Sequence, residues 1–126
     1  SHRDYNLISC GLFDDAAASV ALAHRDVMLR RNQAIVRENL AILDAWVDEH
    51  EHFYYTKPKA GTTALVYYDY DIPSYEFCKE MYHKTGAFVT GDCFEQPHSM
   101  RIGYACDKQT LKDGLAAIAA FADTLK

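Results

Sequence analysis

The feature that most constrains the fold of this chain is a change of hydrophobic period near Phe53. From about Asp26 to His50, apolar residues recur every three or four positions, which predicts one long amphipathic helix. From Phe53 onward they lie in short β-branched and aromatic runs, which predict strands. With a rise of about 1.5 Å per residue, the helix would be roughly 35 Å long, which suits a spine linking two domains.

Local patterns predict three further helices, each marked by a residue that favours a helix end. The last of them contains Gly114, which costs about 1 kcal/mol relative to alanine and therefore predicts close packing by a neighbour. The predicted helices are an alanine-rich one over 16–23 capped by Asp14 or Asp15, one from Pro73 or Ser74 to just before Gly86, and one capped by Asp107 with apolar positions Leu111, Leu115, Ile118, Ala122 and Leu125.

The predicted strands are short, and they are separated by turns rich in glycine and proline. They cover 53–56, 62–70, 87–90 and 100–105. The order of elements predicts an α/β fold of the α+β kind, in which a three- to four-stranded sheet is covered by helices on one or both faces. The length of 126 residues predicts a single domain over 1–126, and the patternless residues 1–11 are the one candidate boundary.

The last predicted strand places one arginine on a face with small neighbours. Met100, Ile102 and Tyr104 alternate with Arg101, Gly103 and Ala105, so the large apolar groups face a core and Arg101 lies on the opposite side. A planar guanidinium that has room around it suits bidentate binding of a carboxylate or phosphate. The alternative is an arginine that simply faces water on the polar side of the sheet.

The composition of the chain limits which binding partners and which cellular location are expected. The net charge is −5 and the basic residues are scattered, which argues against nucleic acid or an anionic membrane as a partner. No apolar run approaches the roughly 20 residues of a membrane span, and no signal peptide is recognisable, so a cytoplasmic protein is expected. The histidines show no metal-ligand spacing, and a zinc site is not expected. Reduced thiols are expected for the widely spaced cysteines, Cys10, Cys78, Cys93 and Cys106.

Several segments match motifs of one known family. Ser99–Ala105 resembles its (L/M)-R-(I/L)-(G/S)-(F/Y)-A strand, and Thr85–Phe94 is similar to its G-V-x-(V/L)-x-P-G-x-x-F segment. Lys57–Thr63 resembles a P-x-G-x-(F/T) turn, and Leu111–Ile118 resembles an L-x-x-G-L-x-x-(I/L) helix. These motifs occur in the family's order across nearly the whole chain. The chain therefore resembles the C-terminal small domain of class I/II pyridoxal-phosphate-dependent aminotransferases of fold type I, with residues 1–11 at the junction to a large domain.

The resemblance implies that Arg101 binds the α-carboxylate of the substrate, because the arginine of this strand has that role in the family. Charge-assisted bidentate bonds would fix the amino acid relative to the cofactor. The loop from Gly91 to Phe94 would lie over the mouth of the site. One departure leaves its path open, because the proline that the family has between Thr90 and Gly91 is missing.

The resemblance also implies pyridoxal 5'-phosphate as cofactor, held as a Schiff base on a lysine in an S-K-x-x-G-x-x-G-x-R context of the large domain. No lysine of this chain has that context; the seven are Lys57, Lys59, Lys79, Lys84, Lys108, Lys112 and Lys126. No catalytic, cofactor-binding or metal-binding residue is therefore expected here. The full-length enzyme is expected to be a homodimer that moves an amino group between an amino acid and a 2-oxo acid, and the chain alone is expected to be inactive.

Three alternatives stay open at this point. The chain could be a free-standing interaction or ligand-binding module of the same fold. The full-length protein could be a lyase, cyclase or acyl transferase of that fold. A small enzyme could instead use Cys93 or His98 near Arg101, because a cysteine and a histidine on one loop support nucleophilic chemistry.

Overall fold

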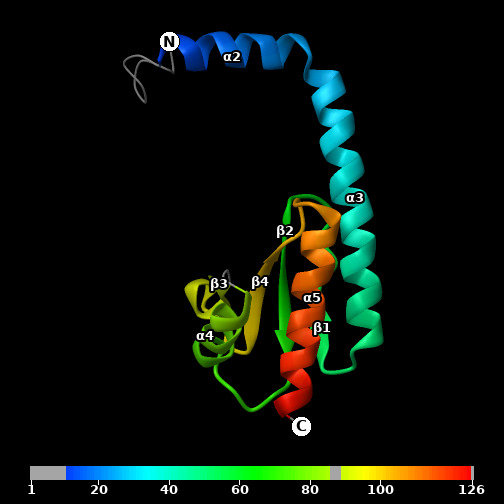
Figure 1. Ribbon diagram of the computed structural model, residues 1–126, viewed down its shortest axis with the longest axis vertical. Helices are drawn as coiled ribbons and strands as arrows, with labels where there is room; N and C mark the ends of the chain where they lie inside the picture. Colours follow the sequence, from blue (N-terminus) through cyan, green and yellow to red (C-terminus); the bar gives the residue numbers. More distant parts are fainter. Residues whose placement is uncertain (1–10, 86–88, 126) are drawn as a thin grey trace. The chain divides into compact units, whose positions relative to one another are not determined.

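The computed structural model describes residues 11–85 and 89–125, and the chain divides into two compact units, Ser1–Gln33 and Ala34–Lys126. The first unit contains α2 (Leu12–Ala23) and the beginning of α3 (Arg25–Glu49), as Figure 1 shows. None of the helices over the described residues is long and apolar enough to cross a membrane. The prediction of a single domain with a junction at residues 1–11 stays a prediction.

Helix α2 begins earlier than the sequence pattern indicates. It follows Gly11 and no side chain caps it, so the predicted cap at Asp14 or Asp15 is wrong. Both aspartates lie in the first helical turn, where their charges favour the positive end of the helix dipole. Apolar side chains of this unit are largely exposed within the chain, namely Leu12, Phe13, Val20, Leu22, Val27, Met28 and Leu29.

The second unit is built on a four-stranded antiparallel sheet. Its strand order is β1 (Phe53–Tyr55), β2 (Thr63–Tyr68), β4 (Ser99–Gly103) and β3 (Val89–Thr90). The remaining elements are α4 (Ser74–Thr85), the 3₁₀ turn η1 (Gly91–Phe94), α5 (Lys108–Ala122) and the 3₁₀ turn η2 (Asp123–Leu125). The predicted fold class is confirmed. The predicted ends of the third helix at Gly86 and of the third strand at residues 87 and 88 lie outside the described residues.

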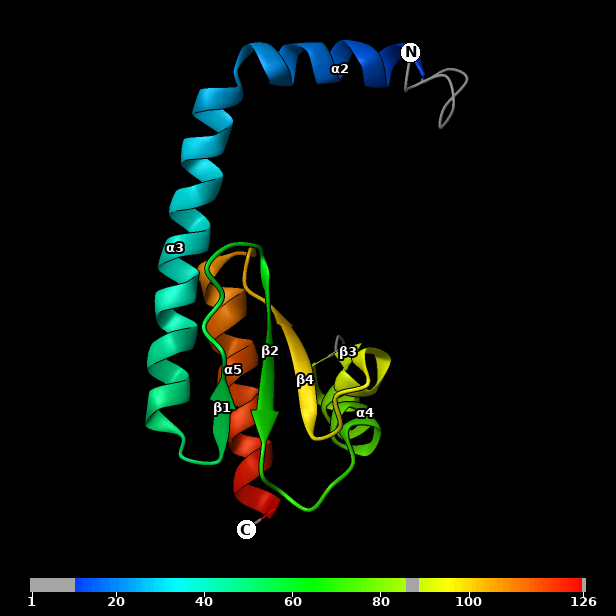
Figure 2. The same ribbon diagram turned by 180° about the vertical axis from the view of Figure 1, so that it is seen from behind.

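The helices of this unit cover one face of the sheet. Figures 1 and 2 show opposite sides, and in the view of Figure 2 α4 and α5 lie behind the strands while the second half of α3 runs along the β1 edge. No helix of described residues in 34–126 covers the other face, which we call the open face. Its exposed or half-buried side chains on the strands are Tyr54, Thr63, Leu65, Tyr67 and Arg101.

The core lies between the sheet and the helices. Along each strand, buried apolar residues that point toward the helices alternate with residues on the open face. On β4, Met100 and Ile102 are buried, as predicted, and so is Tyr104 just beyond the strand. Aromatic rings join the layers: Tyr68 stacks on Phe77 of α4, and Phe77 meets Phe121 of α5 edge-on. The helices contribute the further core residues Leu43, Trp46, Val47, Met81, Leu111, Leu115 and Ile118.

Helix α5 confirms one local prediction and corrects another. The Asp107 carboxylate accepts hydrogen bonds from the backbone N–H groups of Gln109 and Thr110, so it caps the helix as expected. Gly114 is half-buried, and a methyl group built at its Cα would meet nothing within 4 Å. The prediction of close packing at Gly114 is therefore wrong, because only the adjoining turns at Leu111, Leu115 and Ile118 are buried in the core.

Candidate functional site

Arg101 lies in the middle of the sheet, on its open face. Its strand β4 pairs with β2 on one side and β3 on the other, and the Cα partners of Arg101 are Leu65 and Val89. The side chain is exposed, and so are Gly103 and Ala105, which follow it on the same side. A methyl group built at Gly103 would meet nothing within 4 Å, so the space beside the guanidinium is open. The predicted placement of Arg101 is thus confirmed.

The strand that carries Arg101 is held rigidly from the buried side. Met100 and Tyr104 are completely buried, and the Tyr104 hydroxyl donates a 3.0 Å hydrogen bond to the Gly61 carbonyl. The Tyr104 N–H donates to the Thr62 carbonyl at 2.9 Å, which continues the β2–β4 pairing beyond the strand. A functional side chain on such a strand is positioned better than one on a loop, because the backbone beneath it cannot shift.

A buried asparagine on α3 fixes the chain just after β4. The Asn39 side-chain NH₂ donates two hydrogen bonds of 2.8 Å, to the carbonyls of Tyr104 and Cys106. Asn39 is only 1% exposed, and its two bonds satisfy one buried and one partly buried carbonyl. The sequence patterns described above assign no role to Asn39. The available signal was a polar side chain within the apolar stripe of a long helix, between Val36 and Leu43.

The guanidinium of Arg101 lies over an aromatic ring from the loop before its strand. Its Cζ atom is 5.9 Å from the centroid of the Phe94 ring, at the end of η1. Within the described ranges 11–85 and 89–125, Arg101 forms no ion pair with a carboxylate. A permanently charged, exposed fork without an internal counter-ion is free to bind an external anion.

The loop at residues 91–98 passes close to the strand through Gly91. A methyl group built at Gly91 would collide with Ser99 Oγ and the Gln96 carbonyl oxygen, so only glycine fits there. Gly91 is itself buried. The chain reverses through Glu95 and His98, which both have a φ of 55°. The structure thus supplies the path that the missing proline left open: a 3₁₀ turn over Gly91–Phe94 that leads back to β4.

Two aromatic rings share the open face with Arg101. Tyr54 and Tyr67 are paired across β1 and β2, and their rings stack with centroids 5.5 Å apart and planes inclined by 13°. The Tyr67 hydroxyl donates a 3.0 Å hydrogen bond to Gln96 Oε1, which ties this pair to the 91–98 loop. The open face therefore combines one cation with flat apolar surface, a combination suited to a planar carboxylate ligand or to packing against another protein surface.

Cys93 and His98 are not brought together as a catalytic pair. Cys93 is exposed on η1, and the His98 ring lies edge-on to Tyr68, with centroids 5.9 Å apart. Across the residues that the structure describes, no hydrogen bond joins these two side chains. The alternative of a small cysteine enzyme therefore gains no support from geometry. Cys78, Cys93 and Cys106 are free, and Cys10 lies outside the described residues.

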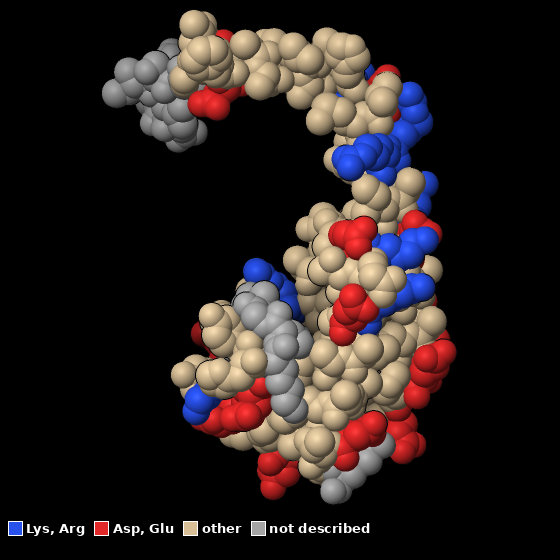
Figure 3. Space-filling model, in the orientation of Figure 1, with Lys and Arg blue, Asp and Glu red and all other residues tan. Residues whose placement is uncertain are grey.

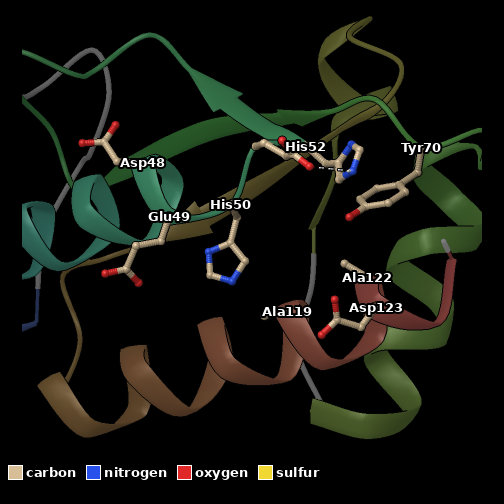
Figure 4. Close-up of a pocket in the computed structure, with 9 residues that line it drawn as sticks. Asp48, Glu49, His50, His52, Tyr70, Ala119, Ala122 and Asp123 are labelled. Atoms are coloured by element: carbon tan, nitrogen blue, oxygen red, sulfur yellow. Dashed lines mark ion pairs between the residues drawn. The ribbon is translucent and has the colours of Figure 1, made fainter.

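The second unit also has a cavity of about 250 Å³, lined by the end of α3, the turn before β1 and the end of α5 (Figure 4). His52 Nδ1 lies 2.7 Å from Asp69 Oδ1, and His50 Nδ1 lies 2.6 Å from the Trp46 carbonyl oxygen, so both histidines have partners. Acidic side chains gather at this end of the unit, as Figure 3 shows. No group of three potential metal ligands occurs in the described part of the chain. None of the lining residues belongs to β4 or η1, so the cavity is separate from the Arg101 site.

The shifted pKa values in this unit belong to residues away from Arg101. The pKa of Asp44 is lowered by a hydrogen-bonded ion pair with Lys57 and by a 2.8 Å hydrogen bond from the Tyr55 hydroxyl. Burial raises the pKa of Tyr55 above its usual range and that of Tyr68 to about 12. Burial also raises the pKa of the Cys78 thiol to about 11, so this cysteine is an unreactive core residue.

Comparison with known proteins shows that the chain is similar to one part of several enzymes. The chain is 38% identical to a PLP-dependent aminotransferase from Streptococcus suis 89-1591, with a TM-score of 0.93 over 99% of this chain and 34% of that one. It is 25% identical to the PLP-dependent cyclase OrfR, with a TM-score of 0.85 over 97% of this chain and 34% of the cyclase. Among curated proteins it is 29% identical to capreomycidine synthase of Streptomyces vinaceus, over 92% of this chain and 30% of the synthase.

These matches delimit what the chain represents. It spans about a third of the length of the proteins it matches. A comparison with protein-family profiles finds no match. Aminotransferases with lower identity, such as the aspartate aminotransferase of Rhizobium meliloti at 20% and a TM-score of 0.71, share the fold. The resemblance predicted from sequence motifs is therefore confirmed.

Proposed function

We propose that this chain, which has the fold of the C-terminal small domain of PLP-dependent aminotransferases, is the part of a longer enzyme that binds the substrate carboxylate. The observation that carries the proposal is the 38% identity to an aminotransferase over 99% of this chain, with a TM-score of 0.93. Arg101 is the binding group. Its exposure on a rigid central strand, without a counter-ion among the described residues, supports that role.

In this proposal the full-length protein moves an amino group between an amino acid and a 2-oxo acid. The guanidinium would donate two parallel N–H···O bonds to the α-carboxylate of either substrate, which fixes both the position and the plane of the carboxylate. The reacting amino group would then be held at a constant distance and direction from the arginine. A homodimer and a cytoplasmic location are further parts of the proposal.

The lysines whose side chains the structure describes do not fit covalent attachment of pyridoxal phosphate. Lys57, Lys79 and Lys108 form ion pairs with Asp44, Glu76 and Glu38, and Lys59 and Lys112 are exposed as well. A lysine that binds this cofactor covalently needs a lowered pKa, which burial or a neighbouring cation provides. All five of these lysines are exposed. The cofactor would therefore be held by the rest of the longer enzyme.

A second candidate is a PLP-dependent cyclase. The similarity to the PLP-dependent cyclase OrfR favours it, because the match covers 97% of this chain. The same carboxylate-binding role of Arg101 would serve either reaction, since positioning an amino acid is needed in both. The two candidates differ only in the chemistry of the longer enzyme.

The test is an assay of the full-length protein loaded with pyridoxal phosphate. We expect amino acids to be consumed together with a 2-oxo acid, in equal amounts, and a new amino acid to form. Conversion of one amino acid into a cyclic product, without any need for a 2-oxo acid, would replace the aminotransferase by the cyclase. If no amino acid of a broad panel is consumed in either assay, both the aminotransferase and the cyclase are contradicted, and a binding module is favoured.

A further inference from the structure

Phe94 is placed against Arg101 by a loop whose shape does not depend on the phenyl ring. The Gln96 N–H donates to the Gly91 carbonyl at 3.1 Å, and Ser99 Oγ donates to the Gln96 carbonyl at 2.7 Å. The Tyr67 hydroxyl binds the Gln96 side chain at 3.0 Å. Each of these bonds closes the loop through atoms outside Phe94. Phe94 is itself 44% exposed and is not one of the core residues.

The loop is also anchored to the neighbouring helix. The Ser99 N–H donates a 3.0 Å hydrogen bond to Ser74 Oγ at the beginning of α4, and both serines are completely buried. The Glu95 N–H donates to the Asp92 carbonyl at 3.1 Å, which closes the 3₁₀ turn that ends at Phe94. The anchor on α4 and the Gly91 contact with Ser99 hold the loop from two sides.

The phenyl ring faces the cation at a distance at which the two attract each other. The 5.9 Å between Arg101 Cζ and the ring centroid is within the roughly 6 Å over which a guanidinium interacts with an aromatic face. An exposed arginine otherwise moves among many rotamers, and it loses that freedom when it binds a carboxylate. A ring that already restricts the guanidinium reduces this loss, so binding becomes tighter.

We propose that Phe94 is a positioning residue, which holds the Arg101 guanidinium against its ring in the orientation that accepts the substrate carboxylate. The inference rests on the proposed function and adds a residue to the same site. It differs from a direct role for Phe94 with the substrate, because the ring acts on the arginine and does not bind the side chain of the amino acid. It also differs from a purely structural role, because the loop is closed by bonds of other residues.

The test compares Phe94→Leu, Phe94→Tyr and a matched control, Tyr75→Leu, in the full-length enzyme. Tyr75 is an aromatic residue on α4 that is 60% exposed, so it reports the cost of removing a surface ring. For an α-amino acid, Phe94→Leu should raise KM about three- to tenfold with kcat nearly unchanged, since the weakened interaction serves both ground and transition state. Phe94→Tyr should restore KM to within about twofold, because tyrosine offers the same aromatic face.

Two further measurements separate positioning from the other roles. An amine that lacks the α-carboxylate should show no change of KM in Phe94→Leu. In an Arg101→Lys background, the effect of Phe94→Leu should fall below about twofold, because an ammonium has no plane to orient and coupled residues are not additive. Should Phe94→Leu lower the melting temperature, Phe94→Met provides a second variant with an unbranched apolar side chain.

The possible results distinguish a failure of the role of Phe94 from a failure of the proposed function. Equal losses for the amino acid and the amine in Phe94→Leu, or a loss as large in Tyr75→Leu, would overturn the inference. If Arg101→Lys discriminates between the two substrates and Phe94→Leu does not, only the role of Phe94 fails and the proposed function stands. If Arg101→Lys itself does not discriminate, both the proposed function and the role of Phe94 fail.

Discussion

Replacing Arg101 by lysine in the full-length enzyme should damage substrate use far more than folding. The side chain is exposed, fills no part of the core and pairs with no carboxylate among residues 11–85 and 89–125, so its loss leaves no cavity and no unpaired carboxylate. Such surface changes cost at most about 0.5 kcal/mol of stability. Lysine keeps the charge, but two parallel hydrogen bonds become at best one.

The expected loss of transition-state stabilisation is about 2–4 kcal/mol, since a charge-assisted bond contributes ~1.5–3 kcal/mol and misorientation adds to it. This corresponds to a decrease of roughly thirty- to a thousandfold in kcat/KM. The assay compares kcat/KM for an amino acid and for its decarboxylated analogue in both proteins, with melting temperature as the control. Equal losses for both substrates, or a melting temperature lowered by about ten degrees or more, would show that Arg101 is a structural residue.

Four other predictions concern the chain itself. Asn39→Ala should lower the free energy of unfolding by about 2–3 kcal/mol, measured in urea, because one buried and one partly buried carbonyl lose their donor; a loss below about 0.5 kcal/mol would contradict this explanation. The lowered pKa of Asp44 stabilises the fold above the ordinary aspartate value of 3.8, and this contribution is lost as pH falls through the folded-state value. Asp44→Asn should therefore cost about 1 kcal/mol at neutral pH and nothing in strong acid, by urea unfolding across pH. Treatment with pyridoxal phosphate and then borohydride should label the isolated chain at several lysines. A single stoichiometric adduct on one lysine, detected by mass spectrometry, would refute the claim that this chain has no specific attachment site for the cofactor. The isolated chain should self-associate or bind an apolar dye through the exposed side chains of α2, and a monomer that binds no dye would count against this.

Local sequence patterns predicted the elements that position Arg101. The alternation of Met100, Ile102 and Tyr104 with Arg101 and Gly103 was sufficient to assign both faces of β4. The cap at Asp107 was equally readable, because an N-cap acts only on the next two or three residues. Such features depend on neighbours in sequence, and a period of two or a single capping residue expresses them directly.

Contacts between distant residues could not be predicted in the same way. Asn39 binds carbonyls that are 65 and 67 positions away, and Phe94 reaches Arg101 only after the chain reverses at Glu95 and His98. Gly91 and Gly114 look alike in sequence, yet only Gly91 lies against a neighbouring segment. Which glycine is indispensable depends on the three-dimensional path of the chain, and no local pattern encodes it.

The most direct test of the central claim is a crystal structure of the full-length protein with an unreactive amino acid analogue bound. The account predicts that both carboxylate oxygens lie about 2.7–2.9 Å from two nitrogens of the Arg101 guanidinium, in one plane with it. A carboxylate bound by another residue, more than about 4 Å from every Arg101 nitrogen, would contradict the account.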